Sequence, residues 1–463
     1  MAVVPASTFA RLSNPSRSTT PSMVLGTATV LGGSVAGLLA ARVLSDHAAS
    51  VLIIERDEPD AGDDQRNGVP QGFQIHALLP GGLSLLERWF PGFTEQVIAA
   101  GACAAPATAR RTYIDGVRKV IGSAATMLTG SRAFLEGQIR ERVLALPNVK
   151  AITARVTDVV FDGDAVSGVS YESSGMSSVE RSDLVIDAMG KSSRMAEWLE
   201  KKGWERPPLR RMVVDLNYAT AVLRREEGDP AGNIHLALKS GKTSGDASGA
   251  MFCRIEGDRW LMMMAGYQDR KPGRTAEDLL RVARQEFPPE FELVADNELV
   301  EEIRTYRHAD SRRRDYHLVS KLPARLVAVG DAVAAFNPVY GQGMSSAALH
   351  ASCLSEYLCS EPELAKPARA FFALQRVVVD AAWDISTGAD LALPHVDGPY
   401  PRGYPVLRWV RNQISAASVY DREIGRRFDE VTYMIQHPSS LARPGVLARA
   451  IAVNLWSKFR SRP

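Results

Sequence analysis

Residues 24–57, VLGTATVLGGSVAGLLAARVLSDHAASVLIIERD, decide the fold expected for this chain. The first ten residues are mostly β-branched or apolar and end in glycines, which predicts a buried strand running into a tight turn. From Ser34 to His47 the apolar residues recur at helical spacing, and VLIIERD at 51–57 is a second apolar run that ends in acid. Strand, turn, helix and strand in this order predict a βαβ unit.

The turn of this unit, Gly32-Gly33-Ser34-Val35-Ala36-Gly37, follows the dinucleotide fingerprint GxGxxG except that Ser34 replaces the middle glycine. Glycines there permit the tight turn and close helix packing, and the helix N-terminus faces a pyrophosphate. Glu55 ends the second strand, where an acid accepts a ribose hydroxyl. A glycine-rich turn that binds nothing is the alternative, but the flanking strand and helix favour a dinucleotide site.

A second stretch, LVAVGDAVAAFNPVYGQGM at 326–344, favours FAD over NAD as the dinucleotide. Gly330 would let the backbone approach the cofactor, and Asp331 would bond a ribityl hydroxyl. The amides of Gly341-Gln342-Gly343-Met344 would open a helix aimed at the flavin ring. A helix N-terminus at that position stabilises the negative charge of reduced flavin.

Composition excludes several other classes of protein. Lys+Arg 55 against Asp+Glu 53 gives a net charge of +2, so no global field favours nucleic acid. The four cysteines form no CxxC pair and no metal-ligand spacing, so we expect no metal and a reducing compartment, the cytoplasm.

The N-terminus permits two interpretations. Residues 18–41 carry no charge and follow Arg11 and Arg17, as in an export signal or membrane span, but four glycines interrupt the run and favour the buried strand and helix. Residues 1–22 are rich in Ser, Thr, Pro and Arg and lack acids, which predicts a disordered leader.

From about Met23 to the 390s the chain is similar to the flavoprotein monooxygenases of the p-hydroxybenzoate hydroxylase superfamily. The resemblance implies FAD contacts at the glycine turn, Glu55 and Gly330-Asp331, with Arg56 beside the adenosine and Pro338 near the isoalloxazine. It also implies that Arg132 in SRAFLEGQIRERV contacts the cofactor and that the backbone of Val156 meets the adenine. A solvated helix-face arginine is the alternative for Arg132.

Stretches such as NGVPQGFQIHALLPGGLSLLE and DAAWDISTGADLALP resemble more closely the actinobacterial epoxidases that act on polyenes in polyether antibiotic biosynthesis. This resemblance implies secondary metabolism and transfer of one oxygen atom from a flavin C4a-hydroperoxide to an apolar natural product, with alkene epoxidation as the first choice. Where that group has Arg and then His after the VPQ turn, this chain has Phe73 and Gln74 and keeps only His76.

A second departure concerns the reductant. In the single-component hydroxylases the strand after residue 182 ends in an Asp-Gly pair tied to FAD and NAD(P)H, and here that pair is Met189-Gly190. A thioether carries no charge and bonds weakly. We therefore expect reduced FAD to come either from NAD(P)H directly or, because of this departure, from a separate flavin reductase.

The expected fold class is α/β (α+β): a Rossmann-like FAD-binding domain with an inserted antiparallel-sheet substrate domain and C-terminal helices. The expected FAD-binding domain comprises 23–100, 127–210 and 305–394, the substrate domain 101–126 and 211–304, and the helical region 395–463.

For the substrate chamber we expect an apolar wall on the inserted sheet. Its candidates are Tyr218, Phe252, Met262 and Met264, with ordinary core packing as the alternative for each. Alternation along a strand puts Met263 on the face opposite to Met262 and Met264. The candidate catalytic residues are His76, Pro338 and Tyr340, and the partners are dioxygen and an apolar small molecule, with no membrane span.

Four other functions share this architecture. An aromatic or indole-type hydroxylase uses the same chemistry, and a cyclase or reductase would need no dioxygen. A halogenase is disfavoured because the WxWxIP signature is absent, and an escort-type chaperone would lack flavin.

Overall fold

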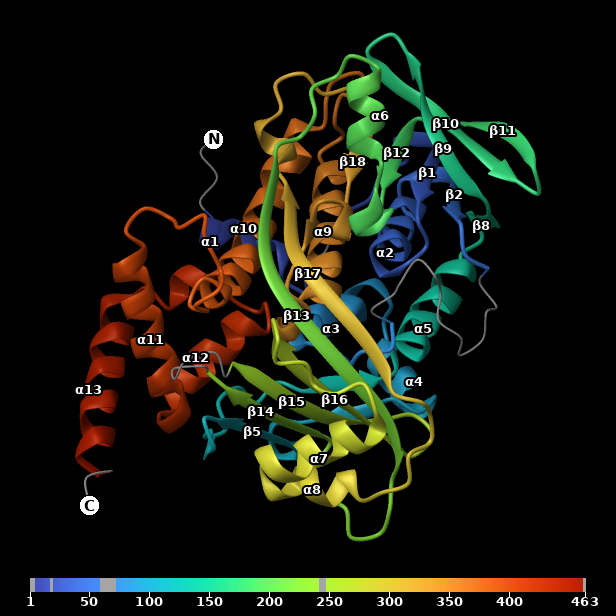
Figure 1. Cartoon of the computed structure of the whole chain (residues 1–463). Coiled ribbons are helices and arrows are strands. Elements are labelled where there is room, and N and C mark those ends of the chain that lie inside the picture. The colour runs from blue at the N-terminus through green and yellow to red at the C-terminus, as the bar shows by residue number, and fades with distance from the viewer. Residues whose placement is uncertain (1–4, 17–19, 59–71, 241–246, 461–463) are drawn as a thin grey trace.

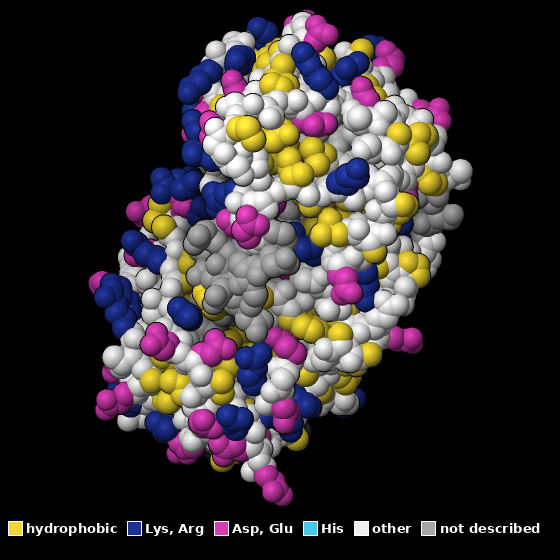
Figure 2. Space-filling model, turned by 90° about the vertical axis from the view of Figure 1, so that its right-hand side faces the viewer, with side chains coloured by type: hydrophobic (Ala, Val, Ile, Leu, Met, Phe, Trp, Pro, Cys, Tyr) yellow, Lys and Arg dark blue, Asp and Glu magenta, His cyan; other side chains and the backbone are white. Residues whose placement is uncertain are grey.

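The computed structural model describes residues 5–16, 20–58, 72–240 and 247–460. Figure 1 shows a parallel sheet with its helices at one end, a larger sheet at the other, and a group of helices beside both. Charged side chains of both signs are spread over the face in Figure 2.

The parallel sheet is the expected Rossmann-like unit. Its strands, in the order β18-β12-β1-β2-β8, are Leu326–Ala328, Leu184–Asp187, Leu25–Leu31, Ala48–Glu55 and Val149–Thr153. Val30 of β1 is in register with Ile53 of β2 and Ile186 of β12, and all three are fully buried. The strands carry apolar side chains on both faces, as expected for a parallel sheet that is covered on both sides.

Helices cover one face of this sheet, and a strand layer with one helix covers the other. The helical face carries α2 (Val35–Ser45), α9 (Gly343–Cys359) and α10 (Arg369–Asp390), with α3 (Pro80–Trp89), α4 (Phe93–Ala99) and α5 (Arg132–Leu144) beside them. The opposite face carries β9 (Arg155–Asp162), β10 (Ala165–Ser173), β11 (Met176–Arg181) and α6 (Met195–Lys201).

The expected disordered leader is wrong for part of its length. Pro5–Leu12 form helix α1, which buries Phe9 and Leu12 in the main core against α9 and α10. Arg11 pairs with Glu356 of α9 at 2.7 Å. Residues 1–4 and 17–19 of that leader lie outside the described residues.

The larger sheet has eight strands and is mostly antiparallel. Its order β19-β17-β13-β16-β15-β14-β5-β6 corresponds to Ala334–Ala335, Arg304–Arg314, Leu209–Arg224, Arg259–Tyr267, Ser248–Ile255, Ile234–Lys239, Arg110–Ile114 and Val117–Arg118. Helices α7 (Ala276–Glu286) and α8 (Pro289–Ala295) pack on the face away from the parallel sheet (Figure 1). A small sheet of β3 (His76–Leu78), β7 (Met127–Gly130) and β4 (Cys103–Ala105) borders it.

The expected boundary at residue 304 does not match this sheet. Strand β17 pairs along β13 from Arg304 to Arg314, so this segment belongs to the large sheet and not to the FAD-binding part. The two strands run the length of the molecule, and their upper ends reach the parallel sheet (Figure 1).

After residue 395 the chain is helical, as predicted. Helices α11 (Tyr404–Tyr420), α12 (Arg422–Thr432) and α13 (Pro444–Arg460) form a group at the side of the molecule (Figure 1). Among the described helices, none combines the length and apolarity needed to cross a membrane.

Candidate functional site

The glycine turn after β1 packs so tightly that side chains are excluded. Gly32 has φ +104°, and a Cβ there would lie 2.5 Å from the Ala188 carbonyl oxygen; a Cβ on Gly37 would lie 1.9 Å from the Gly32 oxygen. Gly37 therefore allows the first turn of α2 to contact the turn, which is the role of the third glycine in dinucleotide folds. No described side chain caps α2 at Ser34, so its first N–H groups remain available to an anion.

A buried charge network lies beside this turn. Ser34 Oγ donates to Glu136 at 2.7 Å and accepts from Arg132 at 3.0 Å. Glu136 also binds Arg140, whose guanidinium reaches the Gly33 carbonyl at 2.7 Å. Within this network two guanidinium groups face one carboxylate, so the α5 side of the turn carries the positive charge that suits a pyrophosphate, while Glu55 lies on the other side.

Sequence reasoning named Arg132 and missed Glu136 and Arg140. Their spacing of four residues along α5 was the available signal, since such residues share one helix face.

Glu55 connects the end of β2 to the turn. Its Oε2 accepts from the Gly33 N–H at 2.7 Å, and Oε1 accepts from the backbone of Arg56 and Asp57. The Arg56 side chain is exposed and lies 3.7 Å from the Asp57 carboxylate. Val156 packs in one cluster with Leu31 and Ile54, so β9 lies against the strand ends that carry the turn and Glu55.

The turn Gly330-Asp331 lies against the start of α2. Gly330 has φ +60°, and a Cβ there would lie 2.4 Å from Ala36 Cβ. The Gly330 N–H donates to His350 Nδ1 of α9 at 2.8 Å, which fixes the turn from the other side. Burial raises the pKa of Asp331, while Arg132 and Lys191 act in the opposite direction. Asp331 is thus within electrostatic reach of the network on α5.

The start of α9 completes this region. Pro338, Val339 and Tyr340 form a 3₁₀ turn, and Gly341 at φ +65° leads into the helix. No described side chain caps α9, and Gly341 and Gly343 are exposed. Gln342 is buried; its Nε2 lies 3.4 Å from the Thr432 carbonyl, and its Oε1 has no partner among the described residues. Met344 packs in the main core.

These observations fit a flavin dinucleotide. The turn Gly330–Ala332 contacts both α2 and α9, so two uncapped helix starts, the arginines of α5, Glu55 and Asp331 belong to one continuous region. Uncapped helix starts suit the pyrophosphate and the anionic flavin ring, and the carboxylates suit ribose and ribityl hydroxyls. Other helices, such as α3, α10 and α11, also lack a described side-chain cap, so the position of these two starts beside the glycine turns marks the region, and not the missing caps alone.

His76 lies on β3 near the same network. Its Nδ1–H donates to the Gln74 carbonyl at 2.8 Å. Burial and, to a smaller extent, Arg132 lower its pKa to about 3, so the ring is neutral at neutral pH. Gln74 Oε1 accepts from Thr220 of β13 at 2.6 Å, and the Phe73 ring lies under the Arg304 guanidinium at 4.7 Å.

Three of the four residues expected on the substrate wall follow the alternative of ordinary core packing. Phe252, Met262 and Met264 are fully buried under α7 and α8, on the outer face of the large sheet. Only Tyr218 is on the inner face, where it packs with Met263 and Val339 next to Pro338. The alternation was anticipated, but which face points inward depends on where α7 and α8 pack.

The Met189-Gly190 pair follows β12. Asp187 accepts from the Met189 N–H at 3.1 Å and from the Ser193 hydroxyl at 2.6 Å and is fully buried. Both hydrogen bonds hold Asp187 within this loop.

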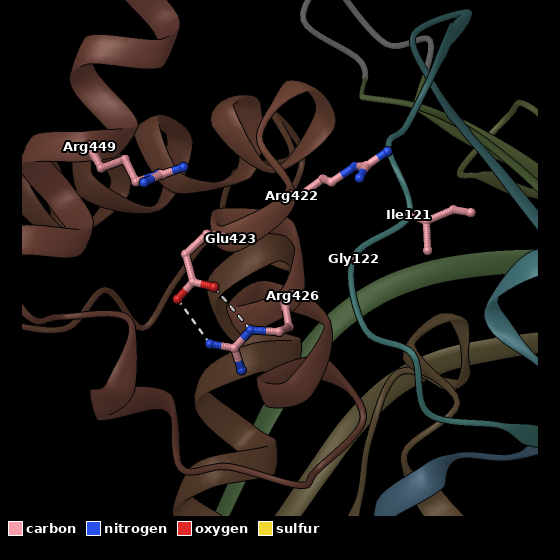
Figure 3. A pocket seen from close by; sticks show the side chains of 6 residues that line it. All are labelled: Ile121, Gly122, Arg422, Glu423, Arg426 and Arg449. Carbon is pink, nitrogen blue, oxygen red and sulfur yellow. Dashed lines mark hydrogen bonds and ion pairs between the residues drawn. The ribbon is translucent and has the colours of Figure 1, made fainter.

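A hollow of about 510 Å³ lies elsewhere, between α12, α13 and the segment after β6 (Figure 3). Arg426 forms paired bonds with Glu423, and Arg449 pairs with Asp421. Both arginines thus already have acid partners.

Comparison with solved structures shows that this chain shares its fold with flavin-dependent enzymes. The structure superposes on the flavin-dependent brominase Bmp2 with a TM-score of 0.64 at 17% identity, covering 94% of this chain and 99% of that one. It superposes on p-nitrophenol 4-monooxygenase PnpA from Pseudomonas putida DLL-E4 with a TM-score of 0.61 at 17% identity, covering 89% and 100%.

The chain also matches Protein Rv3254 of Mycobacterium tuberculosis (strain ATCC 25618 / H37Rv), with 30% identity over 464 residues, 93% of this chain and 94% of that protein. The chain therefore belongs to the same family as Rv3254. No family model matches it.

Proposed function

We propose that this protein is an FAD-dependent monooxygenase that transfers one oxygen atom from dioxygen to an apolar small molecule. The observation that carries the proposal is the convergence of two uncapped helix starts, Glu55 and Asp331 on one region of a flavin-monooxygenase fold.

In this proposal the glycine turn, Arg132 and Arg140 hold the pyrophosphate, and Glu55 accepts a ribose hydroxyl. Arg56 and the backbone of Val156 lie at the adenosine end. Asp331 accepts a ribityl hydroxyl, and Gly341 to Met344 present backbone amides to the ring. Bound FAD, once reduced, supplies the activation of dioxygen. His76 is neutral and half-buried, so its role is to orient neighbouring groups rather than to carry a proton.

The inner face of the large sheet is the proposed substrate wall in place of the outer one. Met263, Tyr218 and Val339 form one apolar cluster next to Pro338, and Val222, Met251 and Leu261 join a second cluster with Leu79. Methionine adapts to irregular ligands, and water exclusion protects a reactive oxygen donor. An apolar alkene, epoxidised at one double bond, is the substrate class that this surface suits best.

For the reductant we propose a separate flavin reductase, with direct reduction by NAD(P)H as the second possibility. Met189 stands where an acid would orient the nicotinamide, and Asp187 is fully engaged in the loop.

Two other reactions remain alternatives on the same fold. Aromatic hydroxylation differs only in the substrate, whereas a cyclase or reductase would consume no dioxygen. The likeness to a brominase concerns the fold alone. Halogenation is disfavoured because no two tryptophans of this chain form a WxW pair.

The test uses FAD-loaded protein, a flavin reductase and a panel of apolar polyenes and aromatic compounds under ¹⁸O₂, with bromide in a parallel sample. We expect one ¹⁸O atom in one product, detected by mass spectrometry. A product without labelled oxygen, or one carrying bromine, would overturn the proposal.

A further inference from the structure

A buried carboxyl group lies directly behind the turn that precedes α9. Asp390 ends α10, and its Oδ1 accepts from Asn337 Nδ2 at 2.8 Å and from the Tyr340 hydroxyl at 3.2 Å. Both Asp390 and Asn337 are 0% exposed. One side chain of the C-terminal half therefore anchors two residues of the segment Asn337–Tyr340.

The other oxygen of this carboxyl group is buried and lacks a hydrogen-bond partner within the described ranges. Asp390 Oδ2 finds no donor among the described residues, and no described cation pairs with it. The Tyr218 hydroxyl, on the inner face of β13, is likewise buried and without a partner in the described part of the chain.

The titratable groups around Asp390 are tyrosines from three elements. Tyr340 bonds to it directly, Tyr267 of β16 lies 3.4 Å from Asn337 Nδ2, and Tyr218 interacts with it electrostatically. Arg411 of α11 lies over Gly388, and its guanidinium donates to the Asp384 carbonyl. None of the three tyrosines is charged at neutral pH.

An ionised carboxyl group in such surroundings is costly, because burial without a cation removes its hydration. Burial raises the pKa of Asp390 to about 7, although the hydrogen bonds from Asn337 and Tyr340 act against the rise. A proton on Oδ2 removes the charge and leaves Oδ1 free to accept both bonds.

Asn337 connects Asp390 to the turn Pro338–Tyr340. Its Oδ1 accepts from the Val339 N–H at 3.0 Å, which closes the 3₁₀ turn Pro338–Tyr340, while its Nδ2 is held by Asp390. The turn leads directly into the uncapped start of α9.

We propose that Asp390 is a positioning residue: through Asn337 and Tyr340 its carboxyl group holds the Pro338–Tyr340 turn against the inner face of the large sheet, and because this site is buried and holds no cation from the described residues, the group does so as a neutral acid. The consequence for the flavin rests on the proposed function; the anchoring itself does not.

The first test uses the purified full chain without FAD. The folded protein binds this proton more tightly than the unfolded chain, whose aspartates have pKa values of about 3.9, so stability is lost as pH rises from about 4 to about 7. Asp390→Asn keeps an acceptor and cannot ionise. We expect the Tm of the wild type to fall by several degrees relative to D390N between pH 5 and pH 8, and the infrared band of a protonated carboxyl group to disappear in D390N.

The matched control is Asp397→Asn, an exposed aspartate seven residues further on, whose Tm should follow that of the wild type at every pH. Parallel Tm curves for wild type and D390N, with no lost infrared band, would overturn the inference. Tyr340→Phe gives an independent check. This variant removes one donor to Oδ1, which raises the pKa of Asp390, so the loss of stability should extend to higher pH. If the midpoint pH of that loss did not change, the inference would be contradicted.

The second test adds FAD and records its visible absorbance against pH. We expect the bands to shift in the wild type over the pH range of the stability loss, and to stay constant in D390N. A constant spectrum in the wild type would remove the link between Asp390 and the flavin. If the protein binds no FAD while the first test succeeds, the proposed function fails and the anchoring role of Asp390 stands.

Discussion

At the scale of the residue, Gly330 combines a positive φ with a crowded Cβ position. We expect Gly330→Ala to lower the free energy of unfolding more than Gly203→Ala, which has a similar positive φ but nothing within 4 Å of its Cβ. Both variants bear about 1–2 kcal/mol of left-handed strain, and only G330A adds a clash with Ala36, worth about 1–3 kcal/mol. Urea denaturation of the two variants measures the difference, and equal losses would contradict the packing described.

Asp331 tests the cofactor contact most simply. We expect Asp331→Asn to weaken FAD binding about tenfold, since a hydrogen bond to a charged group contributes about 1.5–3 kcal/mol, and to leave the folded apoprotein intact. Because burial raises the pKa of Asp331, binding to the wild type should also weaken as pH falls and the carboxylate is protonated. Fluorescence titration with FAD measures both effects. D397N is the control, and unchanged affinity in D331N would refute the contact.

Sequence reasoning at this scale worked where a motif carries its own geometry. The turn Gly32 to Gly37 and the Gly330-Asp331 pair have the strained or crowded backbone that their glycines predict. Arg140 could not be assigned in the same way, because its role depends on the packing of α5 beside α2.

At the scale of the element, the two faces of β16 separate stability from substrate binding. Met264 is 1% exposed under α7 and α8, while Met263 is half-buried on the inner face. We expect Met264→Ala to cost about 2–5 kcal/mol of unfolding free energy and to leave KM unchanged in the surviving enzyme. Met263→Ala should cost less and raise KM for the preferred substrate. Denaturation measures the stability of the two variants, and steady-state kinetics measures their KM. A raised KM in M264A together with an unchanged KM in M263A would indicate that the outer face is the substrate wall.

Helix α1 lies within residues 1–22, which composition alone predicted to be disordered. Averaged over residues 1–22 the chain reads as a polar leader, yet PASTFARL places Thr8, Phe9 and Leu12 toward the core. So short a helix is stable only because it packs on α9 and α10, and the sequence of residues 1–22 contains no information about that surface.

At the scale of the whole molecule, the fold class was predictable and the domain boundaries were not. The βαβ unit and the fold class follow from apolar runs and glycine turns that are local in sequence, whereas the strand order comes from the structure. Strand β17, by contrast, reads RTYRHADSRRR and has no apolar signal. Its place depends on pairing with β13, about ninety residues earlier, and on buried ion pairs such as Lys191 with Asp310.

The choice of reductant is also a property of the whole molecule. We expect FAD-loaded protein to oxidise NADH or NADPH very slowly on its own, with or without substrate, and to form product rapidly once a flavin reductase is added. Met189→Asp is the informative variant, because it restores an acid at the position where single-component enzymes have one. Rapid oxidation of either nicotinamide by the wild type alone would contradict a separate reductase.

The central claim, that this fold activates dioxygen through FAD, is tested most directly by rapid mixing. FAD-loaded protein is reduced without air, mixed with dioxygen and followed by absorbance, with and without apolar polyenes. The account predicts a first phase whose rate depends on dioxygen and a second that does not, the second becoming faster with one compound. A single phase back to oxidised flavin with stoichiometric hydrogen peroxide, under every condition, would contradict it.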